Sequence, residues 1–201
     1  MPTRYKLTKQ DLTTYNGFQW QLNEWKETNG IGKLCSEGWL HCYTNPLLAV
    51  LLNPVHADIE NPKLFECEVE GKCIEDKGRK EGWTRMRLVK EIPLPEISLT
   101  QKVAFGILCA REVYKEEKWV NWANNWLSGK DRSKEFADYV DYADYYIAAN
   151  AAANAANAAA NVTNADYANA DYYAAAAAAN AAAEKEAVCN LIQLANQALK
   201  Y

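Results

Sequence analysis

Hydrophobic and polar residues alternate along part of the first half of the chain and recur with a helical period along the second half. The clearest alternation covers residues 63–73, where Phe65, Cys67 and Val69 alternate with three glutamates. This pattern predicts a β-strand with one buried and one solvent-facing side. Residues 85–92 alternate in the same way. Their arginines are therefore expected to pair across strands with Glu66, Glu68 and Glu70.

Short strands and turns are expected through the rest of the first half, because Gly, Pro and Asn interrupt it about every ten residues. Strands are predicted at residues 4–7, from residue 18 to 20, at 34–35 and at 39–42. Asn45 and Pro46 can start a short helix over residues 47–52, which is expected to end before Pro54. Gly71 is expected to turn or bulge its strand. Pro93 and Pro95 mark the end of this half.

The second half has a helical pattern from its first residues. Ser98 or Thr100 can cap a helix with an apolar face. A second helix is expected to carry Trp119, Trp122 and Trp126 on one face and to end at residues 128–129, and Ser133 can cap a third.

An alanine-rich stretch dominates this half, since 22 of the 36 residues from 148 to 183 are alanine. Alanine is the best helix former. Five asparagines in the stretch are spaced by four, three, four and three residues, which places them in one stripe along a helix. We predict two alanine helices, residues 136–160 and 165–198, packed as a close antiparallel pair with their axes near the low end of ~8–10 Å. The stripe consists of Asn150, Asn154, Asn157, Asn161 and Asn164.

Together these patterns predict an α+β protein with two domains. Residues 1–97 would form a small antiparallel β domain with a short helix. Residues 98–201 would form an alanine-rich antiparallel helical bundle.

Composition narrows the classes of function. The formal net charge is −4, and residues 135–184 hold seven acidic side chains and no Lys or Arg. A surface that binds duplex nucleic acid is therefore not expected there. No apolar run is long enough to span a bilayer, and the first ten residues do not resemble a signal peptide. Six cysteines without an export signal suggest reduced thiols in the cytoplasm.

The cysteines and histidines do not have the spacing of a metal site, because no Cys-x-x-Cys occurs. We predict no metal, no cofactor and no catalytic residue, with Cys67 as a buried core residue. Two enzymatic alternatives remain open. Cys35 or Cys42 could act as a nucleophile with His41 or His56. Residues 38–42, followed by a short helix, loosely resemble an ADP-ribosyltransferase, with Glu66, Glu68 or Glu70 as the acid.

Aromatic residues suggest a further alternative in the first half. Several tryptophans lie near arginines in the sequence, and stacking between them could hold a nucleotide. The protein would then sequester a nucleotide immune signal. The residues proposed for this ligand site are Trp20, Trp39, Tyr43 and Arg85.

A face rich in Tyr, Asp and Asn is our main candidate for contact with a protein partner, because Tyr is common at interfaces. Its acidic residues would suit a basic partner or mimic nucleic acid. The proposed contact residues are Tyr139, Asp141, Tyr142, Tyr145, Tyr146, Asn150, Asn154, Asn157, Tyr167, Asp171 and Tyr173.

About ninety N-terminal residues resemble an uncharacterised domain found in phage and other mobile-element proteins. The shared features are Gly-Phe-x-aromatic at residues 17–20, Leu-Cys-x-x-Gly-aromatic at 34–39, Asn-Pro-Leu at 45–47, Glu-Val-x-Gly at 68–71 and Lys-Glu-Ile at 90–92. The family places a histidine two residues after its glycine. Here His41 lies three residues after Gly38, so no role transfers to it, and the resemblance implies no activity.

The second half resembles an alanine-rich helical family of immunity proteins. Residues 126–129, Trp-Leu-Ser-Gly, and the alanine stretch that follows carry this similarity, whereas the family's Asp-Pro-Arg-Pro-like segment is replaced by residues 118–121. The two resemblances imply a non-enzymatic cytoplasmic binding protein of phage or mobile-element origin. Such a protein would inhibit a bacterial host defence or toxin component by direct contact, and it could be a homo-oligomer.

Overall fold

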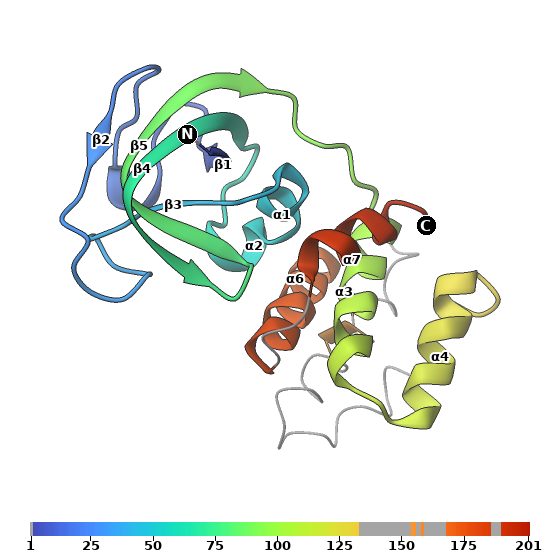
Figure 1. The fold of residues 1–201 in the computed structure, drawn as a ribbon. Helices are drawn as coiled ribbons and strands as arrows, with labels where there is room; N and C mark the ends of the chain where they lie inside the picture. Colours follow the sequence, from blue (N-terminus) through green and yellow to red (C-terminus); the bar gives the residue numbers. More distant parts are fainter. Residues whose placement is uncertain (1, 133–153, 156–157, 159–167, 186–189) are drawn as a thin grey trace. The chain divides into compact units, whose positions relative to one another are not determined.

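The computed structural model describes residues 2–132, 154–155, 158, 168–185 and 190–201. The chain divides into two compact units, Met1–Pro95 and Glu96–Tyr201. Unit 1 contains an antiparallel sheet, and the elements described in unit 2 are helices (Figure 1). The α+β class predicted from the sequence is confirmed.

The sheet of unit 1 has five strands. They are β1 (Thr3–Thr8), β2 (Lys26–Glu27), β3 (Leu40–Cys42), β4 (Lys63–Asp76) and β5 (Lys80–Ile92). Their order is β1-β4-β5-β2, and β3 also pairs with β5. Tyr5 of β1 and Tyr43 exchange two backbone hydrogen bonds of 2.9 and 2.8 Å. This contact brings β1 back to the chain that follows β3, so the sheet curls around a core (Figure 1).

The hairpin of β4 and β5 confirms the main sequence pattern. Phe65, Cys67 and Val69 are buried, while the intervening glutamates are partly exposed. Both strands are longer than predicted, because Lys77 and Gly78 form a tight turn with positive φ angles. The register shifts between Glu70 and Cys73, and Gly71 there has φ +86°. The predicted bulge at Gly71 is therefore confirmed.

Two short helices follow β3. The first, α1 (Pro46–Leu51), begins where the sequence predicts, because the Asn45 side chain accepts a hydrogen bond from the Leu47 amide. Pro54 does not simply end the helical region. It lies in the first turn of a second helix, α2 (Asn53–His56), where its missing N–H costs no hydrogen bond.

Two predicted strands are absent. Residues 18–20 form only a single bridge between Gln19 and Thr13, beside the short 3₁₀ helix η1 (Tyr15–Gly17). Positive φ angles at Leu12, Asn16 and Asn23 keep this segment from becoming an extended strand. Residues 34–35 lie in a turn. The Leu34 side chain fills the space beside Gly82, where a Cβ would lie 2.4 Å from Leu34 Cδ1.

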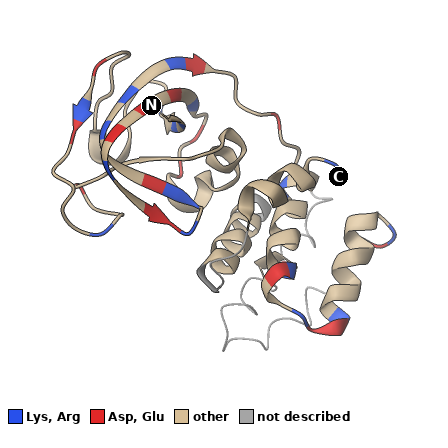
Figure 2. Ribbon diagram, in the orientation of Figure 1, with Lys and Arg blue, Asp and Glu red and all other residues tan. Residues whose placement is uncertain are grey.

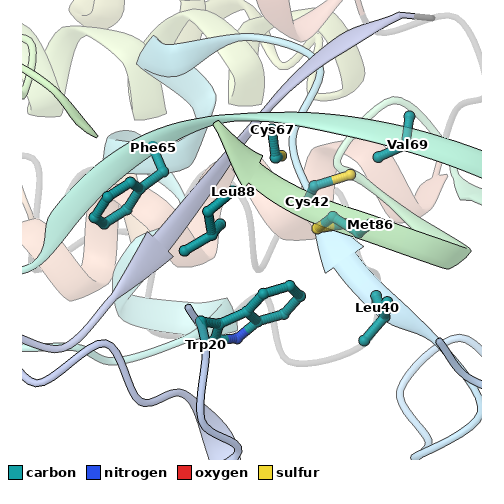
Figure 3. Close-up of a cluster of buried hydrophobic side chains, with 8 residues drawn as sticks. All are labelled: Trp20, Leu40, Cys42, Phe65, Cys67, Val69, Met86 and Leu88. Carbon is teal, nitrogen blue, oxygen red and sulfur yellow. The ribbon is translucent and has the colours of Figure 1, made fainter. Parts of the chain in front are cut away.

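The core of unit 1 lies on the inner side of the curled sheet (Figure 3). Cys42 and Cys67 are fully buried there, so Cys67 has the core position predicted from its register. The Trp20 ring closes the core from the segment between β1 and β2. The core cluster consists of Trp20, Leu40, Cys42, Phe65, Cys67, Val69, Met86 and Leu88.

Unit 2 begins with two helices whose ends follow the predicted signals. In α3 (Leu99–Val113), Ser98 and Gln101 form a capping box. In α4 (Glu117–Ser128), Gly129 ends the helix with φ +74°. Trp119, Trp122 and Trp126 are buried on one side of α4.

The alanine-rich region departs from the prediction in its last part. The helix expected over residues 165–198 is interrupted, because α6 (Ala168–Lys185) and α7 (Leu191–Ala198) are separate helices. The Asn190 backbone is not helical, and its side chain accepts a hydrogen bond from the Gln193 amide. It therefore caps a new helix.

A close helix contact does occur, between α3 and α6. A Cβ on Gly106 would lie 3.0 Å from both Cα and O of Ala175. Of the first predicted alanine helix, residues 136–160, only Asn154, Ala155 and Ala158 belong to the described residues. The predicted close pairing of 136–160 with 165–198 therefore stays a prediction.

Candidate functional site

Most of the tyrosine, aspartate and asparagine face lies outside the described residues. Of the described members, Asn154 is partly buried, Asp171 lies in α6, and Tyr173 of α6 is 41% exposed. The contact role of this face stays a prediction. The members outside the described residues are Tyr139, Asp141, Tyr142, Tyr145, Tyr146, Asn150, Asn157 and Tyr167.

Two of the four residues of the alternative ligand site are buried and so are not open to a ligand. Trp20 is 1% exposed, and its indole N–H donates to Thr14 Oγ1. Tyr43 is buried and stacks on His56. The third member, Trp39, is partly exposed and donates to the Gly32 carbonyl. Arg85 lies on the outer side of the sheet, because the core residue Met86 is its neighbour on β5.

A row of ion pairs occupies the outer side of β4 and β5. Figure 2 shows acidic and basic residues along both strands. The pairs are Glu66 with Lys90, Glu68 with Arg87, and Glu70 with Arg85. The cross-strand pairing predicted from the sequence is therefore confirmed. The three glutamates suggested as acids of an ADP-ribosyltransferase are all engaged by cations of β5.

The Trp25 ring contacts two arginines of this row. The guanidinium carbons of Arg85 and Arg87 lie 4.3 and 4.9 Å from the centre of the half-buried Trp25 ring. Arg85 also binds Glu27 of β2, with 2.9 Å between Nε and Oε1. Cation–π contacts and ion pairs together fix these long side chains, so the outer side presents a preformed surface.

Three apolar side chains precede Trp25 on the same segment between β1 and β2. Tyr15 is 86% exposed, Leu22 48% and Phe18 38%. Phe18 packs on the buried Trp20 ring, with 5.1 Å between ring centres, and Leu22 forms a bridge with Leu88 of β5. We call Tyr15, Phe18, Leu22 and Trp25 the aromatic segment. Sequence reasoning missed it as a surface, because an apolar residue between turn signals has the same appearance whether it is buried or exposed.

The interior of unit 1 contains a buried lysine side chain. Lys6 of β1 is 7% exposed, donates to the His41 carbonyl at 2.6 Å, and lies 4.9 Å from the Trp20 ring centre. Burial lowers the pKa of the Lys6 ammonium. Within the described ranges no carboxylate pairs with it. Its hydrogen bond links β1 to β3, which is a structural role.

The geometry does not support Cys42 as the nucleophile considered from the sequence, and the alternative with Cys35 stays a prediction. Burial raises the pKa of the Cys42 thiol, and the hydrogen bond with Cys67 raises it further. A protonated thiol is a poor nucleophile. His41 is the preceding residue of the strand, so its side chain faces the other side of the sheet from that of Cys42. There its ring Nε2 pairs with the Leu34 carbonyl.

A surface depression, a metal site or a membrane-spanning helix among the described residues could also indicate a function. A shallow depression of about 500 Å³ lies between the end of β1 and the loop after α2. In the described parts of the chain, no group of three His, Cys, Asp or Glu residues is arranged to hold a metal ion. None of the helices that the structure describes has the length and hydropathy of a membrane span. The depression is lined by Lys9, Gln10, Asp11, Asp58, Ile59 and Glu60.

Comparison with known families covers the first half of the chain. Residues 3–100 match a family described as a domain of unknown function (DUF7666). No curated protein and no solved structure matches the chain. The predicted resemblance of the N-terminal half to an uncharacterised domain is therefore confirmed. The resemblance of the second half to immunity proteins stays a prediction.

Proposed function

We propose that this protein acts by binding another protein, with the aromatic segment of unit 1 as a contact surface. The exposure of Tyr15 carries the proposal, because 86% of this large side chain is in solvent while its backbone is held in a defined turn. Rigid exposed aromatic side chains give large contact area at little cost in conformational entropy. Trp25 and its two arginines supply the residue types most enriched among interface hot spots.

The partner is proposed to be a bacterial host protein, a defence or toxin component that the chain inhibits without catalysis. The resemblance of the first half to a phage and mobile-element domain and of the second half to immunity proteins supports this choice of partner. The acidic tyrosine and asparagine face between residues 139 and 173 would provide a second contact with the same partner, suited to a basic surface.

Affinity capture from bacterial lysate tests the proposal. Tagged wild-type protein is compared with a Tyr15→Ser, Leu22→Ser double variant, and bound proteins are identified by mass spectrometry. We expect one or a few host proteins to be retained by the wild type and lost with the double variant. Ile31→Ser is the matched control, since Ile31 is 70% exposed on a different loop of unit 1.

The aromatic segment is not the contact surface if the double variant retains the same proteins as the wild type. A second variant, Asp138→Lys with Asp141→Lys and Asp144→Lys, tests the acidic face separately. A reversal of three charges should weaken capture of a basic partner, and more strongly at low salt. Unchanged capture by both variants would contradict the whole proposal.

A further inference from the structure

An exposed thiol and an amine meet at one edge of unit 1. The Lys80 ammonium, at the start of β5, donates a hydrogen bond to Cys35 Sγ at 3.2 Å. The two residues are 45 positions apart in the sequence. Cys35 is exposed, in contrast to Cys42 and Cys67 in the core. A dissolved oxidant can therefore reach the sulfur while the amine is already beside it.

The turn that carries Cys35 is fixed on both sides of the thiol. The Leu34 side chain occupies the space that a side chain at Gly82 would need. The Leu34 carbonyl pairs with the His41 ring, and the Ser36 carbonyl accepts from the Trp39 amide at 3.4 Å. These contacts hold the turn over β5, so the sulfur and nitrogen are held close before any reaction. Such positioning converts a bimolecular reaction into an intramolecular one.

We propose that Cys35 and Lys80 form an oxidation-induced covalent cross-link, a sulfenamide bond between Sγ and Nζ. Hydrogen peroxide first oxidises the thiol, RSH + H₂O₂ → RSOH + H₂O, in which sulfur loses two electrons to the peroxide oxygen. The ammonium then releases a proton, and the amine nitrogen attacks the sulfur and expels its hydroxyl as water, RSOH + R′NH₂ → RS–NHR′ + H₂O. Sulfenic acids condense with a backbone nitrogen to a sulfenamide by the same chemistry.

The cross-link is reversible by a thiol reductant. Two thiols restore both side chains and leave as a disulfide, RS–NHR′ + 2 R″SH → RSH + R′NH₂ + R″SSR″. The bond would tie the turn at residues 34–38 to the β4–β5 hairpin under oxidising conditions. Reducing conditions would release it, so this edge of unit 1 becomes a redox-responsive element.

Peptide mapping tests the proposal on the full chain. The protein is treated with hydrogen peroxide, alkylated, and digested with trypsin and a glutamate-specific protease. Cleavage after Lys33, Glu37, Arg79 and Glu81 leaves residues 34–37 joined to residues 80–81. We expect this product at a mass two hydrogens below the sum of its peptides. It should disappear after treatment with a thiol reductant.

Two variants and one internal control separate the cross-link from ordinary oxidation. Cys35→Ser removes the sulfur, and Lys80→Arg keeps the positive charge but removes the nucleophilic amine, so neither should give the product. Cys73 is also exposed, but no lysine in the described ranges bonds to it, so it should form none. A Cys35 that gains oxygen without joining Lys80, or that joins another cysteine, would overturn the proposal. A cross-link from Cys35 to a lysine other than Lys80, in the wild type or in the Lys80→Arg variant, would also overturn it.

Discussion

The two units of this chain build their cores by different means. In the described parts of the chain, every buried polar or charged residue belongs to unit 1, namely Lys6, Thr8, Asn53, Arg79 and Glu81. The described core of unit 2 is apolar, with alanines of α6 and tryptophans of α4. Unit 1 therefore combines its hydrophobic core cluster with directional hydrogen bonds and ion pairs among buried side chains. Unit 2 relies on how closely two backbones approach.

This difference determines which substitutions each unit tolerates. A buried ion pair fails when one partner is removed, because the other charge stays out of water without compensation. A close helix contact fails when one methyl group is added, because neither backbone can move away without loss of its other contacts. The first effect is expected in unit 1 and the second in unit 2.

The largest effect is expected at Glu81 in unit 1. Its carboxylate accepts two hydrogen bonds from the Arg4 guanidinium, at 2.6 and 3.0 Å, and one from the Trp83 indole at 2.7 Å. Glu81→Gln keeps the shape but removes the charge, so we expect the free energy of unfolding to fall by about 3 kcal/mol. Urea denaturation followed by tryptophan fluorescence measures it.

The control for Glu81 is a pair on the outer side of the same sheet. Glu66 binds Lys90 at 3.2 Å, and the Lys90 side chain is 62% exposed. Glu66→Gln should therefore cost less than about 1 kcal/mol. Equal losses in the two variants would show that burial does not set the strength of the ion pairs in unit 1.

The loss of stability from an added methyl group at a close helix contact is expected at Gly106 in α3. Gly→Ala in an exposed helix normally stabilises by about 1 kcal/mol, because alanine has the higher helix propensity. Here the added Cβ would lie 3.0 Å from Ala175 Cα and O, so we expect Gly106→Ala to lower the free energy of unfolding by about 1–3 kcal/mol. The test is the sign of the change in the free energy of unfolding, which is measured by denaturation followed by circular dichroism. A more stable variant would contradict the close contact.

How much of the structure could be predicted from the sequence differs between the two units. The β4–β5 hairpin, its bulge and its ion pairs follow from local alternation, because a period of two places each side chain on a known side. Helix ends at Ser98 and Gly129 follow from capping chemistry. The interruption at Asn190 was missed, because an asparagine inside a helical pattern is ambiguous between a helix interior and a cap.

The candidate sites depend on tertiary contacts that no local pattern contains. Trp20 and Tyr43 are residue types typical of a ligand site, yet both are buried in the fold. Cys35 and Lys80 are brought together by the packing of Leu34 against Gly82, which has no counterpart in sequence spacing. The exposure of Tyr15 depends on positive φ angles in its segment, including that of Asn16. Sequence reasoning identifies candidate residue types here but not which of them meet.

The smallest effect is expected at His41. It makes the stability of unit 1, but not that of unit 2, depend on the titration of a histidine. Its pKa is lowered to about 4, chiefly by burial and also by the nearby charges of Lys6 and Lys80, against a raising effect of the Leu34 carbonyl. Between pH 6.5 and 4 the unfolded chain takes up a proton at this residue and the folded chain does not. The contribution to stability is therefore present above pH 6.5 and is lost as pH falls toward 4.

His41→Gln removes this titration and keeps a side-chain amide that can donate to the Leu34 carbonyl. Because His41 is partly exposed, solvent screens the effect, and we expect the wild type to lose on the order of 1 kcal/mol more than the variant between pH 7 and pH 4.5. Denaturation of both proteins at the two pH values measures this difference, and the carboxylates common to both cancel in the comparison. Both histidines of the chain belong to unit 1. The pH-dependent difference should therefore appear in the unfolding of unit 1, and parallel pH profiles for the two proteins would show that burial of His41 has no energetic consequence.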